Sequence, residues 1–336
     1  MGWVAGAPTV RSKSVGWVTS MKPSIPVLRP PAAHSGTGIS VISPASYANE
    51  ERIEEGLNAL CELGFEPRLG PHSLERGPLF FAGTPGHRLA VLHGAFTNPN
   101  TSLIASVRGG YGSNYLLSGL NLNLIRQHPK PFLAYSDLTA VQLYLLDKLG
   151  LPAFHGPMVA ADFDREDGVH MPSLTASLAG QPYTVGQAEG LRTIRNVPSR
   201  SVIRGTLYGG CLSILVALLG TPWEPQTEGK LLFIEDTGAK PHQIDRMLWQ
   251  LRHSGKFDGV SAIIFGEMLN CAASSAPELL EEAILSALDG LDFPVAFGLQ
   301  SGHVTGLNVT LTFGVQAELH TTGEPRLEIL EPAVLS

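Results

Sequence analysis

Ser113 follows a glycine-rich segment and could act as a nucleophile. The segment 108–112 (RGGYG) has glycines at 109, 110 and 112, which permit positive φ angles and close approach of the backbone to a ligand. Such a loop at the start of a helix suits a nucleophile whose oxyanion is bound by backbone amides, here those of Asn114 and Gly110. The alternative for Ser113 is a role as the helix N-cap alone.

Two further loops carry the groups that a serine nucleophile needs, a base and a carboxylate that orients it. Glu235 and Asp236 directly follow the apolar run 231–234, and His303 lies in the glycine-flanked loop 300–308. An acidic pair in this place can instead be solvated or cap the next turn, and a loop histidine can be structural. Each of these patterns is weak evidence alone, and only their combination indicates a catalytic site.

Residues of three loops are candidates for substrate contact. Tyr135 and Ser136 follow an apolar run, although Ser136 or Asp137 could instead cap the next helix. His155 ends a short apolar run and could line a cleft or bind the backbone. Arg108 could bind a substrate carboxylate through a bidentate pair, or it could brace the glycine-rich segment.

These loops are expected at the carboxyl ends of strands in an open α/β sheet. The apolar run 39–42 predicts a strand, and apolar spacing over 50–63, closed by Gly64, predicts a helix. Strand and helix patterns then alternate, which predicts a doubly wound, mostly parallel sheet. The further elements expected in the first half are strands at 103–107 and 132–135 and helices at 113–122 and 138–149.

The chain is predicted to form two α/β domains. Residues 1–36 are expected to be a disordered extension, residues 37–160 the domain with the nucleophile, and residues 188–332 a second, smaller domain with the acid and the base. The polar segment 161–187 is expected to be a linker or excursion. The elements expected in the second domain are strands at 203–207, 231–234, 260–265, 308–313 and 327–329 and helices at 212–219, 241–253 and 277–288.

Composition excludes several classes of protein. The 336 residues carry 23 Lys and Arg against 30 Asp and Glu, a net charge of −7, which does not favour nucleic-acid binding. Neither a signal peptide nor a membrane span is expected, and three cysteines without metal-ligand spacing predict a reducing, cytoplasmic location. Metal- and nucleotide-binding motifs are missing, so the sequence predicts a hydrolase without metal or cofactor.

Six segments resemble, in order, the L,D-carboxypeptidases of peptidase family S66, the muramoyltetrapeptide carboxypeptidases. They are SVRGGYGSNYLL, AYSDLTAV, FHGPM, LYGGCLSIL, FIEDTGAKPHQIDRML and SGHVTGLNVTLTFG, and the resemblance covers about residues 37–332. In that family the serine of the Gly-Tyr-Gly-Ser motif is the nucleophile, the first acid of the Glu-Asp pair orients the base, and the histidine of the Gly-His loop is the base. The resemblance therefore implies a catalytic triad of Ser113, Glu235 and His303 in a cleft between the domains.

The resemblance also implies a substrate. The expected reaction is release of the terminal D-alanine from a murein tetrapeptide during peptidoglycan recycling, and the enzyme is expected to be a homodimer. One alternative is the branch of the family that confers microcin immunity by hydrolysing peptide-nucleotide or aminoacyl-adenylate antibiotics. Its members resemble one another in stacking the base on an aromatic residue of an inserted loop, whereas segment 162–187 here holds no tryptophan. A second alternative is a two-lobed binding protein without catalysis.

Overall fold

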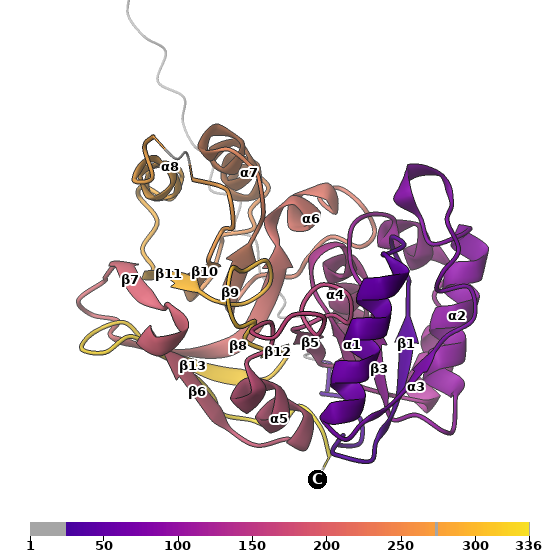
Figure 1. Cartoon of the computed structure of the whole chain (residues 1–336). Coiled ribbons are helices and arrows are strands. Elements are labelled where there is room, and N and C mark those ends of the chain that lie inside the picture. The colour runs from indigo at the N-terminus through magenta and orange to yellow at the C-terminus, as the bar shows by residue number, and fades with distance from the viewer. Residues whose placement is uncertain (1–24, 273–274, 336) are drawn as a thin grey trace, which may run out of the picture.

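The computed structural model describes residues 25–272 and 275–335, which form two β-sheets with helices packed against them (Figure 1). The first sheet has six strands in the order β12-β5-β4-β3-β1-β2. Their bounds are β1 (Gly38–Ile42), β2 (Glu66–Leu69), β3 (Leu103–Ser106), β4 (Phe132–Ala134), β5 (Ala153–His155) and β12 (Leu311–Phe313). All neighbouring strands are parallel except β12 and β5, which are antiparallel.

Helices cover both faces of this first sheet. They are α1 (Glu50–Glu62), α2 (Pro85–Thr97), α3 (Leu122–Gln127) and α4 (Thr139–Leu149). Because successive strand side chains point to opposite faces, Val41 of β1 packs into one buried cluster with Ile53 of α1, whereas Ile42 packs into another with Leu92 of α2. The prediction of a doubly wound, mostly parallel sheet is confirmed.

The second sheet has eight strands in the order β6-β14-β13-β8-β9-β10-β11-β7, so in strand number it is the larger of the two. Its strands are β6 (Tyr183–Gly186), β7 (Arg192–Arg195), β8 (Val202–Cys211), β9 (Lys230–Glu235), β10 (Ala262–Gly266), β11 (Val295–Leu299), β13 (Gln316–His320) and β14 (Arg326–Ile329). The central four, β8 to β11, are parallel, and the outer strands join them antiparallel.

The remaining helices accompany the second half of the chain. They are α5 (Met171–Ala179), α6 (Leu212–Ala217), α7 (Pro241–His253), α8 (Leu279–Ala287) and the short 3₁₀ helix η4 (Gln187–Glu189). Helix α7 has the predicted bounds, because a proline opens it and apolar residues recur at helical spacing. None of the helices in the described ranges is both long and apolar enough to cross a bilayer.

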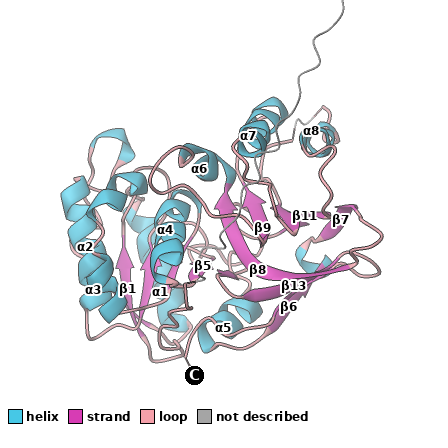
Figure 2. Ribbon diagram, turned by 180° about the vertical axis from the view of Figure 1, so that it is seen from behind, coloured by secondary structure: helices cyan, strands magenta, loops and turns pink. Residues whose placement is uncertain are grey.

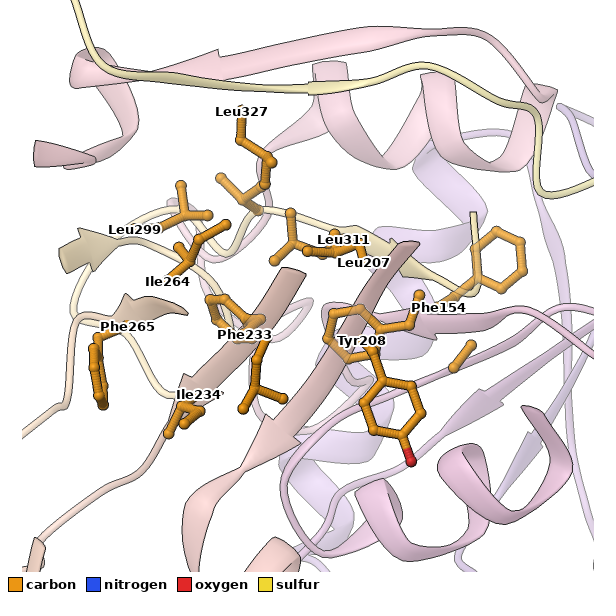
Figure 3. Close-up of a cluster of buried hydrophobic side chains, with 14 of the residues drawn as sticks. Phe154, Leu207, Tyr208, Phe233, Ile234, Ile264, Phe265, Leu299, Leu311 and Leu327 are labelled. Atoms are coloured by element: carbon orange, nitrogen blue, oxygen red, sulfur yellow. The ribbon is translucent and has the colours of Figure 1, made fainter. Parts of the chain in front are cut away.

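One buried cluster joins the two sheets. Phe154 of β5 and Leu311 of β12 come from the first sheet, and Phe233 of β9 and Leu327 of β14 come from the second (Figure 3). All four side chains are nearly or fully excluded from solvent. The two sheets therefore share apolar contacts, which fixes the strand ends of one relative to those of the other.

Strand β12 departs from the prediction. The segment 308–313 was expected in the second domain, but Leu311 pairs with His155 and Phe313 with Ala153. The chain thus returns late to complete the first sheet at the edge of β5. Apolar alternation predicts a strand but does not say which strand it will pair with, and this explains the error.

Residues 25–36 are ordered, contrary to the expected disordered extension. The amide of Leu28 donates to the carbonyl of Gly150 at 2.8 Å, and that of Ala33 donates to the carbonyl of Leu178 at 3.0 Å. Pro31 also forms a bridge with Leu335 near the other end of the chain. The rest of the predicted extension, residues 1–24, lies outside the described residues.

The segment 161–187, expected to be a linker or excursion, contains regular structure. Helix α5 lies within it and packs against β6, the edge strand of the second sheet (Figure 2). The amide of Thr310 donates to the hydroxyl of Ser173 in α5 at 2.9 Å. The segment therefore packs on both sheets, through the run that leads into β12.

Candidate active site

Ser113 is the first residue of a 3₁₀ helix, η2 (Ser113–Gly119), that follows the glycine-rich segment. Gly112 before it has a φ of 113°, and a Cβ at this position would lie 2.6 Å from the ring of Phe81. Ser113 is buried, its hydroxyl donates to the backbone carbonyl of Asp137 at 2.6 Å, and its amide donates to the Asp137 carboxylate at 2.8 Å. The predicted helix start is confirmed, although the helix is 3₁₀ and shorter than expected.

Asp137 binds the start of η2 although it lies in a different helix, η3 (Ser136–Leu138). Burial raises the pKa of Asp137, and the hydrogen bonds from Ser113 oppose that rise. Ser136 has a φ of 63°, a strained angle for a residue with a side chain, and a Cβ at Gly109 would lie 2.8 Å from it. The two loops therefore fit closely, and Ser136 remains a candidate for substrate contact.

Two residues that the sequence analysis missed hold the glycine-rich segment. Arg88 is buried and donates through Nη1 to the carbonyls of Pro44 at 3.0 Å and Gly112 at 2.7 Å. The hydroxyl of Ser46 accepts the amide of Tyr111 at 3.0 Å. Arg88 could have been suspected, because it occupies a core-facing position of α2, where a charge is unusual.

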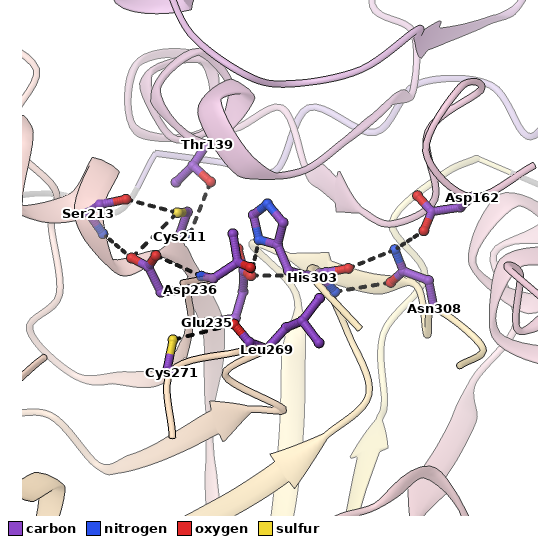
Figure 4. Close-up of polar contacts among 12 residues, drawn as sticks. Thr139, Asp162, Cys211, Ser213, Glu235, Asp236, Leu269, Cys271, His303 and Asn308 are labelled. Carbon is purple, nitrogen blue, oxygen red and sulfur yellow. Dashed lines mark hydrogen bonds and ion pairs between the residues drawn. The ribbon is translucent and has the colours of Figure 1, made fainter. Parts of the chain in front are cut away.

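Glu235 and His303 form a hydrogen-bonded pair (Figure 4). Glu235 is the last residue of β9, and His303 lies in the loop that follows β11. Nδ1 of His303 lies 2.7 Å from Oε2 of Glu235, and the same oxygen accepts the backbone amide of His303 at 3.1 Å. This double contact fixes the ring with Nδ1 on the carboxylate and leaves Nε2 for other partners.

Glu235 and His303 each stabilise the charged form of the other. Burial alone would raise the pKa of Glu235, but the charge and hydrogen bond of His303 outweigh it and lower that pKa. Burial alone would lower the pKa of His303, but the charge and hydrogen bond of Glu235 outweigh it and raise that pKa. The arrangement is therefore an anionic carboxylate that stabilises an imidazolium.

Tyr135 connects the two halves of the site. Its ring meets the ring of His303 edge-on, with centroids 5.1 Å apart. Asp137, two residues later, binds Ser113. Ser113 and His303 therefore both contact the segment 135–137, although they come from different sheets. Tyr135 is buried, and its ring also lies near that of His155, with centroids 5.9 Å apart.

His155 does not line a cleft, contrary to the prediction. It has no exposed surface and lies among the rings of Tyr135, Phe233 and Phe313. Burial lowers the pKa of His155 to about 4, so it is neutral near pH 7. Among the described residues, neither of its ring nitrogens has a hydrogen-bond partner. Because no surface of His155 is exposed, a substrate cannot contact it in this arrangement.

The other predicted contact residues are accessible. Arg108, Gly110 and Asn114 are all exposed on the segment around Ser113. Gly110 has a φ of 100°, and a Cβ there would lie 2.5 Å from the hydroxyl oxygen of Ser46. Arg108 forms no ion pair with an acidic side chain in the described part of the chain, so its guanidinium can bind an external carboxylate.

Asp162 and Asn308, at the right of Figure 4, support the loop of His303. The side-chain amide of Asn308 donates to the Asp162 carboxylate at 3.3 Å and to the carbonyl of Gly302 at 3.1 Å, and its oxygen accepts the Gly302 amide at 3.0 Å. Burial raises the pKa of Asp162 to about 6. Asp162 lies in the segment that the sequence analysis treated as a linker, so its role was missed.

Cys211 and Asp236 belong to the helix beside the site. Cys211 is the N-cap residue of α6, is buried and has its thiol pKa raised by that burial. The Asp236 carboxylate accepts the amide of Ser213 at 2.8 Å, which binds a free donor at the start of α6. The two adjacent acids therefore have different roles. Glu235 orients His303, and Asp236 caps a helix.

Two family models and a relative of known name match the chain. Residues 39–156 match the LD-carboxypeptidase N-terminal domain, and residues 204–319 match the LD-carboxypeptidase C-terminal domain. The chain is 34% identical over 300 residues to a protein named as a probable murein peptide carboxypeptidase from Bacillus subtilis (strain 168), covering 87% of this chain and 92% of that protein.

Two solved structures are also similar. Muramoyltetrapeptide carboxypeptidase from Oxalobacter formigenes has a TM-score of 0.77 and 28% identity, covering 88% of this chain and 99% of that one. An inactive mutant of the microcin C7 self-immunity protein MccF in the apo state has a TM-score of 0.83 and 26% identity, covering 92% of this chain and all of that one, and MccF is also found as a relative from Escherichia coli. With both domain matches in order along one chain, this protein belongs to the LD-carboxypeptidase family, peptidase family S66.

Proposed function

We propose that the protein is a serine-type carboxypeptidase that hydrolyses an L,D-peptide bond and releases D-alanine from a murein tetrapeptide in peptidoglycan recycling. The observation that carries the proposal is the hydrogen-bonded pair of Glu235 and His303. Nδ1 of His303 is bound to the carboxylate, its Nε2 is available, and its ring contacts the segment 135–137 that also binds Ser113. A base oriented in this way is what a serine nucleophile requires.

In the first half of the reaction, Ser113 Oγ attacks the carbonyl carbon of the L-configured centre of the diamino acid. His303 Nε2 takes the serine proton, and Glu235 stabilises the resulting imidazolium. The amides of Asn114 and Gly110 bind the oxyanion. His303 then gives its proton to the departing D-alanine amine, which leaves Ser113 acylated.

In the second half, water replaces the amine. His303 takes a proton from the water as the oxygen attacks the acyl carbon, and the proton returns to Ser113 Oγ when the ester bond breaks. Arg108 is the proposed partner of the D-alanine carboxylate, because it is exposed beside the glycine-rich segment. Ser136 is proposed as a second contact on the opposing loop.

The proposal is supported by relatives named for the same substrate class, a probable murein peptide carboxypeptidase and a murein tetrapeptide carboxypeptidase from Pseudomonas aeruginosa. Its test is D-alanine release from free and sugar-linked tetrapeptides by the wild type and by Ser113→Ala. We expect release by the wild type only. Binding of the tetrapeptide without release by the wild type would instead establish the catalytically silent binding protein.

A second candidate is hydrolysis of peptide-nucleotide or aminoacyl-adenylate antibiotics, because the fold is also similar to that of MccF, with a TM-score of 0.83. An aminoacyl sulfamoyl adenylate offered beside the tetrapeptide separates the two. Faster turnover of the adenylate would make immunity the function. We further propose a cytoplasmic homodimer, which light scattering and cell fractionation can test.

A further inference from the structure

A cluster of two histidines and a glutamate lies outside the candidate active site, where the loop after β2 meets the start of α2. His72 and His87 each direct Nδ1 at the carboxylate of Glu75, and the contact of His87 with Oε2 is 2.9 Å. The two imidazole rings are stacked, with centroids 4.4 Å apart. The ligand atoms of the three residues all lie within 4.8 Å of one another.

The local backbone positions two of these three side chains. His87 lies in the first turn of α2, where its amide donates to the Thr84 hydroxyl at 3.1 Å. Glu75 sits over Gly83, whose φ is 76° and where a Cβ would lie 2.2 Å from the carboxylate oxygen. A side chain at position 83 would therefore displace Glu75, so the glycine provides the space that the carboxylate occupies.

The chemistry of this set favours a transition-metal ion over a hard cation. Two imidazole nitrogens and one carboxylate are ligands that zinc takes at sites that keep further positions for water. All three side chains are partly exposed, with His87 47% and Glu75 36% accessible, so an ion can enter.

A second group of similar composition is less suited to an ion. Glu318, His320 and Glu328 also lie close together, but Arg326 already occupies that group. Its Nε lies 2.7 Å from Glu328, and its Nη2 lies 3.4 Å from His320. A guanidinium in this place neutralises the acidic groups and repels a metal cation.

We propose that His72, Glu75 and His87 bind a zinc ion that fastens the loop 72–87 beside the glycine-rich segment. That loop contains Phe81, whose ring lies 5.5 Å from the ring of Tyr111 and 5.7 Å from that of Tyr115. An ion bound to residues 72 and 87 would close this loop and restrict the motion of Phe81. None of the three ligands is a residue of the proposed catalytic triad, so the proposed hydrolysis does not require the ion.

The test is titration of the full-length, metal-free protein with zinc chloride by calorimetry. We expect one ion per chain and at least about a tenfold loss of affinity in His87→Ala and in Glu75→Gln, since losing even an outer partner of a metal ligand costs about that much. His320→Ala and Cys61→Ala are matched controls that remove donors elsewhere and should bind zinc as the wild type does. Absence of saturable binding in the wild type, or unchanged binding in His87→Ala, would overturn the proposal.

A second measurement guards against a misfolded variant. Zinc should raise the melting temperature of the wild type and leave that of His87→Ala unchanged, with both proteins melting alike in EDTA. If His87→Ala melts lower in EDTA, His72→Ala replaces it, because His72 lies outside the helix. Equal stabilisation of wild type and of that variant by zinc would also overturn the site.

Discussion

The hydroxyl of Ser113 donates to the backbone carbonyl of Asp137, 2.6 Å away, while its amide is bound by the carboxylate of the same residue. The backbone of the proposed nucleophile is therefore fixed, and its side chain has a hydrogen bond that must break before attack. Rotation about the Cα–Cβ bond of Ser113 would release the hydroxyl from this carbonyl and move it to another staggered position.

Removing the proposed nucleophile and base should give equal and non-additive losses. We expect Ser113→Ala and His303→Ala each to lower kcat by about 10³–10⁶-fold, and the double variant to be little worse, because triad members act as a unit. Steady-state rates of D-alanine release measure this. Losses that multiply in the double variant would show that the two residues act separately.

Replacing Glu235 should move the pH profile. The rate needs neutral His303, so kcat/KM should rise with pH through the His303 pKa, which the charge of Glu235 holds above its usual value against the effect of burial. Glu235→Gln should therefore shift this limb to lower pH and reduce the maximum rate by about 10³–10⁴-fold. Asp236→Asn, its neighbour, is the control and should shift the limb less. An unmoved limb in Glu235→Gln would argue against His303 as the base.

The buried His155 should make the fold sensitive to acid. Its pKa of about 4 in the folded state lies below the unfolded value of about 6.5, so the unfolded chain takes up the proton first. Stability is then complete above about pH 6.5 and is lost as the pH falls toward 4, by about 3 kcal/mol over that window.

His155→Leu isolates this effect, since the ring nitrogens have no partners in the described structure that the change would leave unpaired. Urea unfolding from pH 7.5 to 4.5 should show a smaller loss in the variant than in the wild type. The raised pKa values of Asp147 and Asp162, both about 6, act in the opposite direction but are common to both proteins. Parallel pH curves for the two proteins would contradict the prediction.

The site should distinguish the configuration of the leaving residue. We expect a tetrapeptide ending in D-alanine to be cleaved at least about a hundredfold better in kcat/KM than its L-alanine epimer, because misplacing the carboxylate leaves buried polar groups unpaired. Amidating that carboxylate should cost a comparable factor if Arg108 binds it. Arg108→Ala should then cleave acid and amide alike, while Arg126→Ala, an exposed arginine on α3, should keep the preference. If Arg108→Ala still prefers the acid to the amide, Arg108 does not bind this carboxylate.

Local sequence patterns were enough to predict most of the helices and strands. They also predicted that the three proposed catalytic residues follow the ends of strands. Ser113, Glu235 and His303 all follow apolar runs that end in short loops, and such loops gather at the carboxyl ends of parallel strands. The contact between Glu235 and His303, which are 68 residues apart, was expected from the resemblance to the family, and the structure contains it.

Non-local features could not be read from the sequence. The buried Arg88 lies on a helix whose pattern was missed, and its partners come from loops far along the chain. His155 has the flanking residues of a loop histidine, yet aromatic rings from the second sheet and from β12 enclose it. Periodicity reports which face of an element is apolar but not what packs against it.

The late return of β12 to the first sheet has a consequence for synthesis. Strand β5 ends at His155, but its partner strand ends at Phe313, so about half of the chain must be made before the edge of the first sheet is covered. During synthesis, the edge of β5 would therefore stay unpaired until β12 has been made. An unpaired strand edge can pair with other chains. The first sheet can be completed only after residues 311–313 have been synthesised.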